Sequence, residues 1–188
     1  GELGFFGILI PEEYGGLGLG AFEYCLVAEE LSRAWMSVAS IIARGNSFYT
    51  SVPGTGEARR RNIERMARGQ YLGAVALSEP GVGADLSGVT CRARRDGDEW
   101  VITGNKYWCT FADGADYINV FARTAKPTHP KKRWEGISCF LIEKKRGEFP
   151  PGMVGQPIPK IGYFGWKTFE LALNDLRVPR ENLIGAPG

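Results

Sequence analysis

The sequence is poor in the residues that build metal sites and disulfide frameworks. It contains one histidine and four cysteines, and no two cysteines form a C-x-x-C pair. Structural zinc sites need four cysteine or histidine ligands at short spacing, so we expect no metal centre. We expect reduced thiols, and therefore a cytoplasmic protein or, in a eukaryote, one of the mitochondrial matrix. The residues concerned are His129, Cys25, Cys91, Cys109 and Cys139.

A strong charge imbalance and a long apolar run are also missing. The net charge is only +2, whereas nucleic-acid-binding domains are usually far more basic, so we expect no nucleic-acid partner. No apolar run approaches the ~20 residues that cross a bilayer, so we expect no membrane span. What is present, 44% hydrophobic and 23% charged residues in a chain of 188, is typical of a globular protein with one domain or two small ones.

The first part of the chain has helical periodicity. Apolar residues recur at helical spacing over 21–35 and again over 38–49. Thr55 is placed to cap a third helix that runs to Arg68 and is stopped by Gly69. The arginines of this third segment are expected to form a solvated face rather than a binding patch.

After Gln70 the pattern changes to alternation, with many β-branched and aromatic residues. Helices followed by strands favour an α+β fold, with a helical domain at 1–71 and a β domain at 72–188. The sequence predicts polar loops at 124–135 and 146–155, and an exposed, linker-like tail from Val178. The predicted strands are 74–77, 91–95, 99–103, 105–110, 117–123, 137–143 and 168–173, the second and third being joined by an Asp-Gly hairpin.

The first candidate motif is AVALSEPGVGAD, at 74–85. It reads as a buried strand that stops at a hydroxyl, a carboxylate, a proline and two glycines. Pro80 removes a donor from the ladder, and Gly81 and Gly83 permit backbone conformations that are closed to other residues. The amide groups of such a loop can approach a planar or anionic ligand closely.

The second candidate motif is KYWCT, at 106–110. Residues two apart on a strand share a face. Trp108 can therefore cover a ring while Thr110 forms a hydrogen bond with the edge of that ring. Each motif alone is a weak signal, and the pair in this order is a specific one.

The first motif also admits other interpretations. The dinucleotide fingerprint needs a helix after its glycines, whereas strands follow here, and the Lys-Ser/Thr of a P-loop is missing. A plain β-turn stays open for the glycines alone. Ser78 as a nucleophile needs an adjacent base, for which His129 in its loop is poorly suited. Glu79 is expected to be structural, with a role as general base as the alternative.

Four segments carry a resemblance to the acyl-CoA dehydrogenases, which are FAD-dependent flavoproteins. They occur in the order and spacing of that family over nearly the whole chain. The segments are PEEYGGLG at 11–18, LSEPGVGAD at 77–85, WCT at 108–110 and FELALNDLRVPRENLIG at 169–185.

The resemblance implies an N-terminal helical domain, truncated at its start, and an antiparallel β-barrel or sandwich middle domain that binds flavin. It places the C-terminal helical bundle of the family, and the glutamate that serves as catalytic base, beyond Gly188, so no catalytic residue is assigned in this chain. It further implies an acyl-CoA substrate, an electron-transfer flavoprotein or similar acceptor, and a homodimer or homotetramer. Because the chain begins with Gly1, we expect it to be a fragment.

By the same resemblance, the first motif corresponds to the flavin-binding loop of the family. Ser78 stands where a hydroxyl meets the pyrimidine edge of the isoalloxazine, and Trp108 stands where an aromatic side chain packs on the ring. Thr110 stands where a hydroxyl bonds the ring nitrogen that accepts hydride. The other residues implied to border the cofactor are Val75, Leu77, Gly83, Ala84 and Cys109.

The chain departs from the family pattern at several positions. The family usually has serine where this chain has Ala84, and that serine touches the thioester ligand, so Ala84 is also the candidate substrate residue. Cys109 and Phe111 replace a commoner isoleucine and asparagine, and FAD binding is expected to survive both changes. Trp166 stands where relatives often have serine. The basic run 131–133 can meet the phosphates of CoA or form a solvated loop.

The implied function is α,β-dehydrogenation of an acyl-CoA thioester by the full-length protein, with hydride passing to FAD. The 188-residue chain alone is expected to be inactive. Three alternatives stay open: an oxidase or flavin monooxygenase on the same scaffold, a non-catalytic flavin- or CoA-binding subunit that completes the site of a partner, and a structural α+β module.

Overall fold

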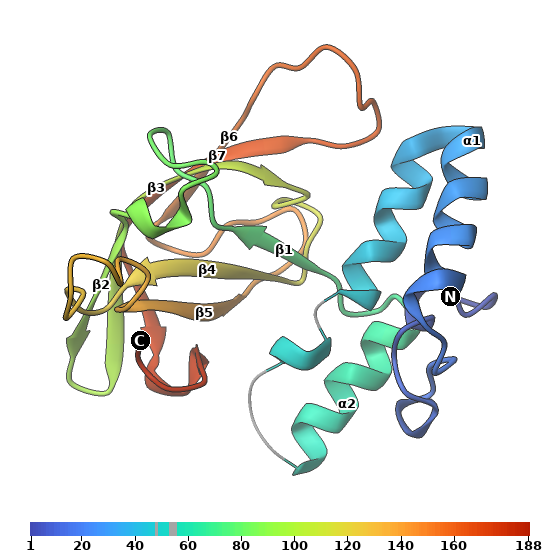
Figure 1. Cartoon of the computed structure of the whole chain (residues 1–188), viewed down its shortest axis with the longest axis horizontal. Helices are drawn as coiled ribbons and strands as arrows, with labels where there is room; N and C mark the ends of the chain where they lie inside the picture. The colour runs from blue at the N-terminus through green and yellow to red at the C-terminus, as the bar shows by residue number, and fades with distance from the viewer. Residues whose placement is uncertain (48, 53–55) are drawn as a thin grey trace. The chain divides into compact units, whose positions relative to one another are not determined.

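The computed structural model describes residues 1–47, 49–52 and 56–188. The chain forms two compact units (Figure 1). One unit comprises Gly1–Gly73 together with Lys160–Trp166, and the other comprises Ala74–Pro159 together with Lys167–Gly188. The predicted capping residue Thr55 lies outside the described residues.

The first unit is helical. Helix α1 is Ala21–Asn46 and helix α2 is Gly56–Ala67, with 3₁₀ turns at Phe5–Gly7, Glu12–Tyr14 and Tyr49–Ser51. The carboxylate of Glu23 accepts a hydrogen bond from the Gly20 amide at 3.0 Å where α1 begins. Within α1, Trp35 has φ −162° and ψ 113°, so the predicted break between the two periodic segments is real. Figure 1 shows the ribbon of α1 turning back partway along its length.

The N-terminal segment is tied to α1 by a buried asparagine. Asn46 accepts a hydrogen bond from the Leu9 amide at 2.8 Å and donates to the Phe5 carbonyl at 2.8 Å. Burial of a side-chain amide is tolerable because both ends find partners. The apolar core of this unit includes Ile8, Ile10, Ile42, Ile63 and Met66.

The segment Lys160–Trp166 belongs to this helical unit. Trp166 is buried, and its indole N–H donates to the Ser37 carbonyl at 2.8 Å. The Tyr163 hydroxyl lies 2.5 Å from the Ser40 hydroxyl. The tryptophan that departs from the family pattern therefore has a physical reason, because it anchors this segment to α1.

The second unit is one eight-stranded, mainly antiparallel sheet with the order β6-β7-β3-β2-β4-β5-β8, and β1 pairs with β4. The α+β prediction is confirmed. The apolar core is continuous and includes the Trp100–Phe140 ring pair, whose centroids lie 5.4 Å apart. The strands are β1 Gly73–Ala76, β2 Arg92–Asp96, β3 Glu99–Thr110, β4 Tyr117–Arg123, β5 Ile137–Glu143, β6 Met153–Pro157, β7 Thr168–Pro179 and β8 Leu183–Ile184.

Three predicted boundaries were wrong. The strands predicted at 99–103 and 105–110 are one strand, β3, and Gly104 lies at a register shift within it. The loop predicted at 146–155 ends early, because β6 begins at Met153. Val178 is buried inside β7 and pairs with Trp100, so it does not start a linker.

Among the residues that the structure describes, no helix is both long enough and apolar enough to span a membrane.

Candidate functional site

The first motif forms a tight turn directly after β1. The amide of Glu79 donates to the Val82 carbonyl at 3.0 Å, and the Val82 amide donates back to the Glu79 carbonyl at 3.0 Å. Pro80 and Gly81 occupy the tip, so the β-turn interpretation describes the local geometry correctly.

The two glycines of the turn are not required by the chain itself. Neither Gly81 nor Gly83 has a positive φ, so the predicted special backbone conformation was wrong. A Cβ atom built on either residue would meet nothing within 4 Å. Glycine can also serve where a ligand approaches the backbone closely, because it has no side chain to cover the backbone amide. This second reason fits Gly81 and Gly83.

A buried ion pair anchors the turn. The Lys106 ammonium lies 2.8 Å from Oε1 of Glu79, and the side chains are 0% and 3% exposed. The Glu79 carboxylate also accepts hydrogen bonds from the Thr90 amide (2.8 Å), the Thr90 hydroxyl (2.6 Å) and the Cys91 amide (2.9 Å). Burial alone would raise the pKa of Glu79, but these hydrogen bonds outweigh it and lower the pKa.

The alternative of Glu79 as a general base does not suit this geometry. Its oxygens are already engaged by four donors, and a lowered pKa weakens a carboxylate as a proton acceptor. Glu79 is a structural anchor, as expected. The sequence signal that was missed is the lysine at a buried position of β3, since lysine is almost never fully buried unless it is paired.

The anchor brings the two motifs together. The Lys106 ammonium donates to the Leu77 carbonyl at 3.1 Å, and the Tyr107 amide donates to the Ser78 carbonyl at 2.8 Å. The backbone at Ser78 is therefore bonded to the residue that precedes Trp108. The two motifs form one continuous surface element rather than two separate ones.

The end of β3 carries a β-bulge. Between Lys106 and Cys109 the register against β7 shifts by one residue. Strict alternation from the fully buried Lys106 would turn Trp108 inward, but the bulge re-aims the indole, which is 56% exposed. Cys109 is fully buried and Thr110 is partly exposed, so exposure alternates over these last three residues.

Backbone strain is concentrated at the same place. Trp108 has φ 60° and Phe111 has φ 70°. Large aromatic residues rarely adopt this left-handed region, and each instance costs on the order of 1–3 kcal/mol. Such strain persists where the surrounding structure enforces it, and it clusters at functional sites.

Thr110 has a hydroxyl partner behind it. Thr110 and Thr168 face each other directly in the β3–β7 register. Their Oγ1 atoms lie 3.1 Å apart, and either can be the donor. Thr168 is buried, at 4% exposure. The alternating pattern predicts Thr168 in a strand, but no local signal in the sequence connects it with Thr110.

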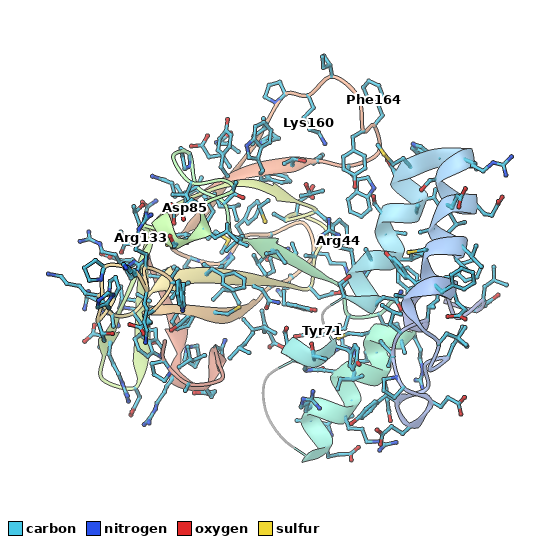
Figure 2. The ribbon with its side chains drawn as sticks, viewed as in Figure 1. Arg44, Tyr71, Asp85, Arg133, Lys160 and Phe164 are labelled. Atoms are coloured by element: carbon cyan, nitrogen blue, oxygen red, sulfur yellow. The ribbon has the colours of Figure 1, made fainter. Side chains whose placement is uncertain are left out.

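Beyond the turn, the glycine loop borders a cavity of about 580 Å³. Arg133 lines this cavity and forms an ion pair with Asp85 at 2.9 Å, and Figure 2 shows the two labelled side chains together. Gly83 contributes to the cavity wall, whereas the neighbouring Ala84 is exposed. Of the basic run, Arg133 is thus the residue placed beside the first motif. The cavity is lined by Glu79, Pro80, Gly81, Val82, Gly83, Asp85, Gly88, Thr90, Gly104, Asn105 and Arg133.

The remaining predicted site residues lie on β1 and just after it. Val75 and Leu77 are both partly buried. His129 is exposed on its loop.

Two cysteines are unsuited to nucleophilic chemistry, because burial raises the pKa of Cys91 to about 11 and that of Cys139 to about 12.

Comparison with known proteins identifies relatives over the whole chain. It is 39% identical over 191 residues to a (2S)-methylsuccinyl-CoA dehydrogenase of Cereibacter sphaeroides, covering 98% of this chain and 34% of that protein. The structure matches butyryl-CoA dehydrogenase from Megasphaera elsdenii with a TM-score of 0.82 and 31% identity, covering 99% of this chain and 49% of that one. It matches a glutaryl-CoA dehydrogenase from Mycobacterium smegmatis, solved in complex with FADH2, with a TM-score of 0.83 and 30% identity, covering 100% and 46%.

The chain therefore spans less than half the length of each of these relatives. Two family models match it: "Acyl-CoA dehydrogenase, N-terminal domain" over residues 1–70 and "Acyl-CoA dehydrogenase, middle domain" over residues 74–176. The chain belongs to the acyl-CoA dehydrogenase family, a family of FAD-dependent oxidoreductases, and comprises N-terminal and middle domains of that family.

Proposed function

We propose that this chain carries one face of the FAD site of an acyl-CoA dehydrogenase, which in the full-length protein removes two hydrogens from an acyl-CoA thioester. The observation that carries the proposal is the exposed indole of Trp108. It is held outward by a bulge and a strained backbone, two residues before Thr110, and the preceding Tyr107 is hydrogen-bonded to Ser78 of the first motif. A flat, largely apolar ring needs an aromatic wall and a few well-placed polar groups.

The chemistry of these side chains supports FAD as the ligand, because they combine an aromatic ring with hydroxyl groups. Trp108 would pack on the ring system, Thr110 would bond the ring nitrogen, and Ser78 would meet the pyrimidine edge. FAD supplies the hydride acceptor of the reaction. The chain supplies the positions of these groups, because the Glu79–Lys106 pair fixes the turn against β3. The neighbours proposed to border the cofactor are Val75, Leu77, Gly83, Ala84 and Cys109.

The acyl-CoA substrate is proposed to reach the site along the glycine loop. Ala84 marks the position where a hydroxyl would touch the thioester ligand. Arg133 is the candidate for a CoA phosphate, and its charge is already shared with Asp85. We assign the proton-accepting glutamate to a part of the protein outside residues 1–188. The proposal includes a homo-oligomer and an electron-transfer flavoprotein or similar acceptor.

The test is FAD binding by the whole protein and by its Trp108→Ala variant. Because aromatic packing contributes about 1 kcal/mol beyond buried area, the variant should bind FAD at least about fivefold more weakly. Trp134→Ala is the matched control, since Trp134 is similarly exposed at 62% in the β4–β5 loop. A protein that binds no FAD, or one in which both variants bind it equally well, would overturn the proposal.

Activity provides a second, independent measurement. The whole protein should oxidise members of a panel of acyl-CoAs in the presence of an electron acceptor. The isolated 188-residue chain should show no turnover, because it lacks the assigned base. Turnover by the isolated chain would contradict that assignment.

A further inference from the structure

The Thr110–Thr168 pair has an arrangement that the proposed flavin contact does not by itself require. One hydroxyl is partly exposed at the end of β3, and the other is buried directly behind it on β7. The Oγ1 atoms lie 3.1 Å apart, which is within hydrogen-bonding reach. The outer hydroxyl is thus backed by a second group that can both donate and accept.

A hydroxyl carries one proton and two lone pairs, and its proton rotates to suit its partners. When Thr110 donates its proton outward, its oxygen can accept the proton of Thr168. When Thr110 instead accepts a hydrogen bond from outside, its own proton can turn inward to the Thr168 oxygen. The same pair of oxygen positions serves both directions without any movement of the backbone.

We propose that Thr168 is a positioning residue that allows Thr110 to bond the flavin in both of its redox states. This inference rests on the proposed function. The ring nitrogen facing Thr110 is an acceptor in oxidised flavin and carries a proton in reduced flavin. The Thr110–Thr168 hydrogen bond therefore reverses between the two states, and only hydroxyl protons rotate; no covalent bond in the protein forms or breaks.

Removal of the Thr168 hydroxyl affects the two states unequally. In the oxidised state, Thr110 still donates its outward hydrogen bond. It loses only the hydrogen bond that its oxygen accepted from the Thr168 hydroxyl. In the reduced state, the inward-turned proton of Thr110 loses its acceptor. A donor turned toward the protein interior without a partner is worse tolerated than an acceptor with a spare lone pair, so the Thr168→Val variant should favour oxidised flavin.

The test measures the flavin reduction potential of the whole FAD-loaded protein. One unmade hydrogen bond corresponds to about a tenfold change in the ratio of affinities for reduced and oxidised flavin. For a two-electron couple a tenfold change is about 30 mV, so Thr168→Val should lower the potential by about 30 mV. Thr168→Ser, which restores the hydroxyl, should return it to the wild-type value.

The chain offers a matched control. Thr124 and Ser138 form another hydroxyl–hydroxyl contact at 2.8 Å, outside the proposed site. Thr124→Val should leave the flavin potential unchanged, since it removes a similar contact that does not face the ring. A potential that falls equally in Thr124→Val and Thr168→Val would reflect general loosening of the sheet and would overturn the inference.

A double-mutant cycle separates failure of this inference from failure of the proposed function. With Thr110→Val already present, Thr168→Val should add no further shift, because the two hydroxyls act as one unit. If Thr110→Val shifts the potential and Thr168→Val does not, or raises it, the positioning role of Thr168 is refuted while the flavin site stands. If Thr110→Val has no effect on either affinity or potential, the proposed contact itself is refuted.

Discussion

The buried Glu79–Lys106 pair makes the sharpest prediction about stability. Replacing Lys106 with Met, which has a similar length, removes the ammonium and leaves the Glu79 carboxylate buried. That carboxylate keeps the hydrogen bonds from the Thr90 amide, the Thr90 hydroxyl and the Cys91 amide. Breaking a buried pair costs about 3–5 kcal/mol, and the three remaining donors place this variant near the lower end, at about 3 kcal/mol.

The opposite replacement should cost more. In Glu79→Gln the Lys106 ammonium stays buried and keeps the Leu77 carbonyl, 3.1 Å away, as its remaining main-chain acceptor. The glutamine amide also presents donors where the native carboxylate only accepts. We expect Glu79→Gln to lower the free energy of unfolding by about 4–5 kcal/mol. The double variant removes both charges, so its cost should fall about 2 kcal/mol or more below the sum of the two single costs.

The assay is urea unfolding followed by far-UV circular dichroism, at one fixed flavin saturation because bound ligand adds to apparent stability. Arg177→Met is the control, since Arg177 pairs with Asp96 and Glu99 at the exposed surface and should show no measurable change. A Lys106→Met variant as stable as the wild type, or two single costs that add fully in the double variant, would contradict a stabilising role for this ion pair.

Three further predictions concern titration, substrate and thiols. The folded-state pKa of Glu79 is lowered, so its carboxylate stabilises the fold above the ordinary glutamate pKa of about 4.3, and this stabilisation is lost as the pH falls through the folded-state pKa. The free energy of unfolding should therefore fall less steeply with decreasing pH in Glu79→Gln than in the wild type. Identical pH profiles of the two proteins would contradict this. Ala84→Ser should tighten acyl-CoA binding about fivefold, the value of one added hydrogen bond, as measured by calorimetry. Cys25 is exposed, whereas burial raises the pKa of Cys91 to about 11 and that of Cys139 to about 12. A thiol reagent at pH 7 should therefore label Cys25 first. Labelling of Cys91 before Cys25 would contradict the structure.

Much of the fold is local in origin, and the sequence alone determined that part. The helical period of 21–35, the alternation of 117–123 and 137–143 and the Asp-Gly hairpin each depend on neighbours a few residues apart. The strands β4 Tyr117–Arg123 and β5 Ile137–Glu143 match their predicted limits. The adjacency of the two motifs was expected from the family resemblance, because the periodicity of the residues does not predict it.

The tertiary structure alone decided how the site is held. The Glu79–Lys106 pair spans 27 residues of sequence and the Thr110–Thr168 contact spans 58. The bulge that turns Trp108 outward exists only as a register shift between β3 and β7. Strand order and register are set by pairing between distant segments, and a one-residue shift in register reverses which side chains are buried. Local patterns cannot express such a choice, so only the folded sheet reveals the lysine and the second threonine that support the predicted site.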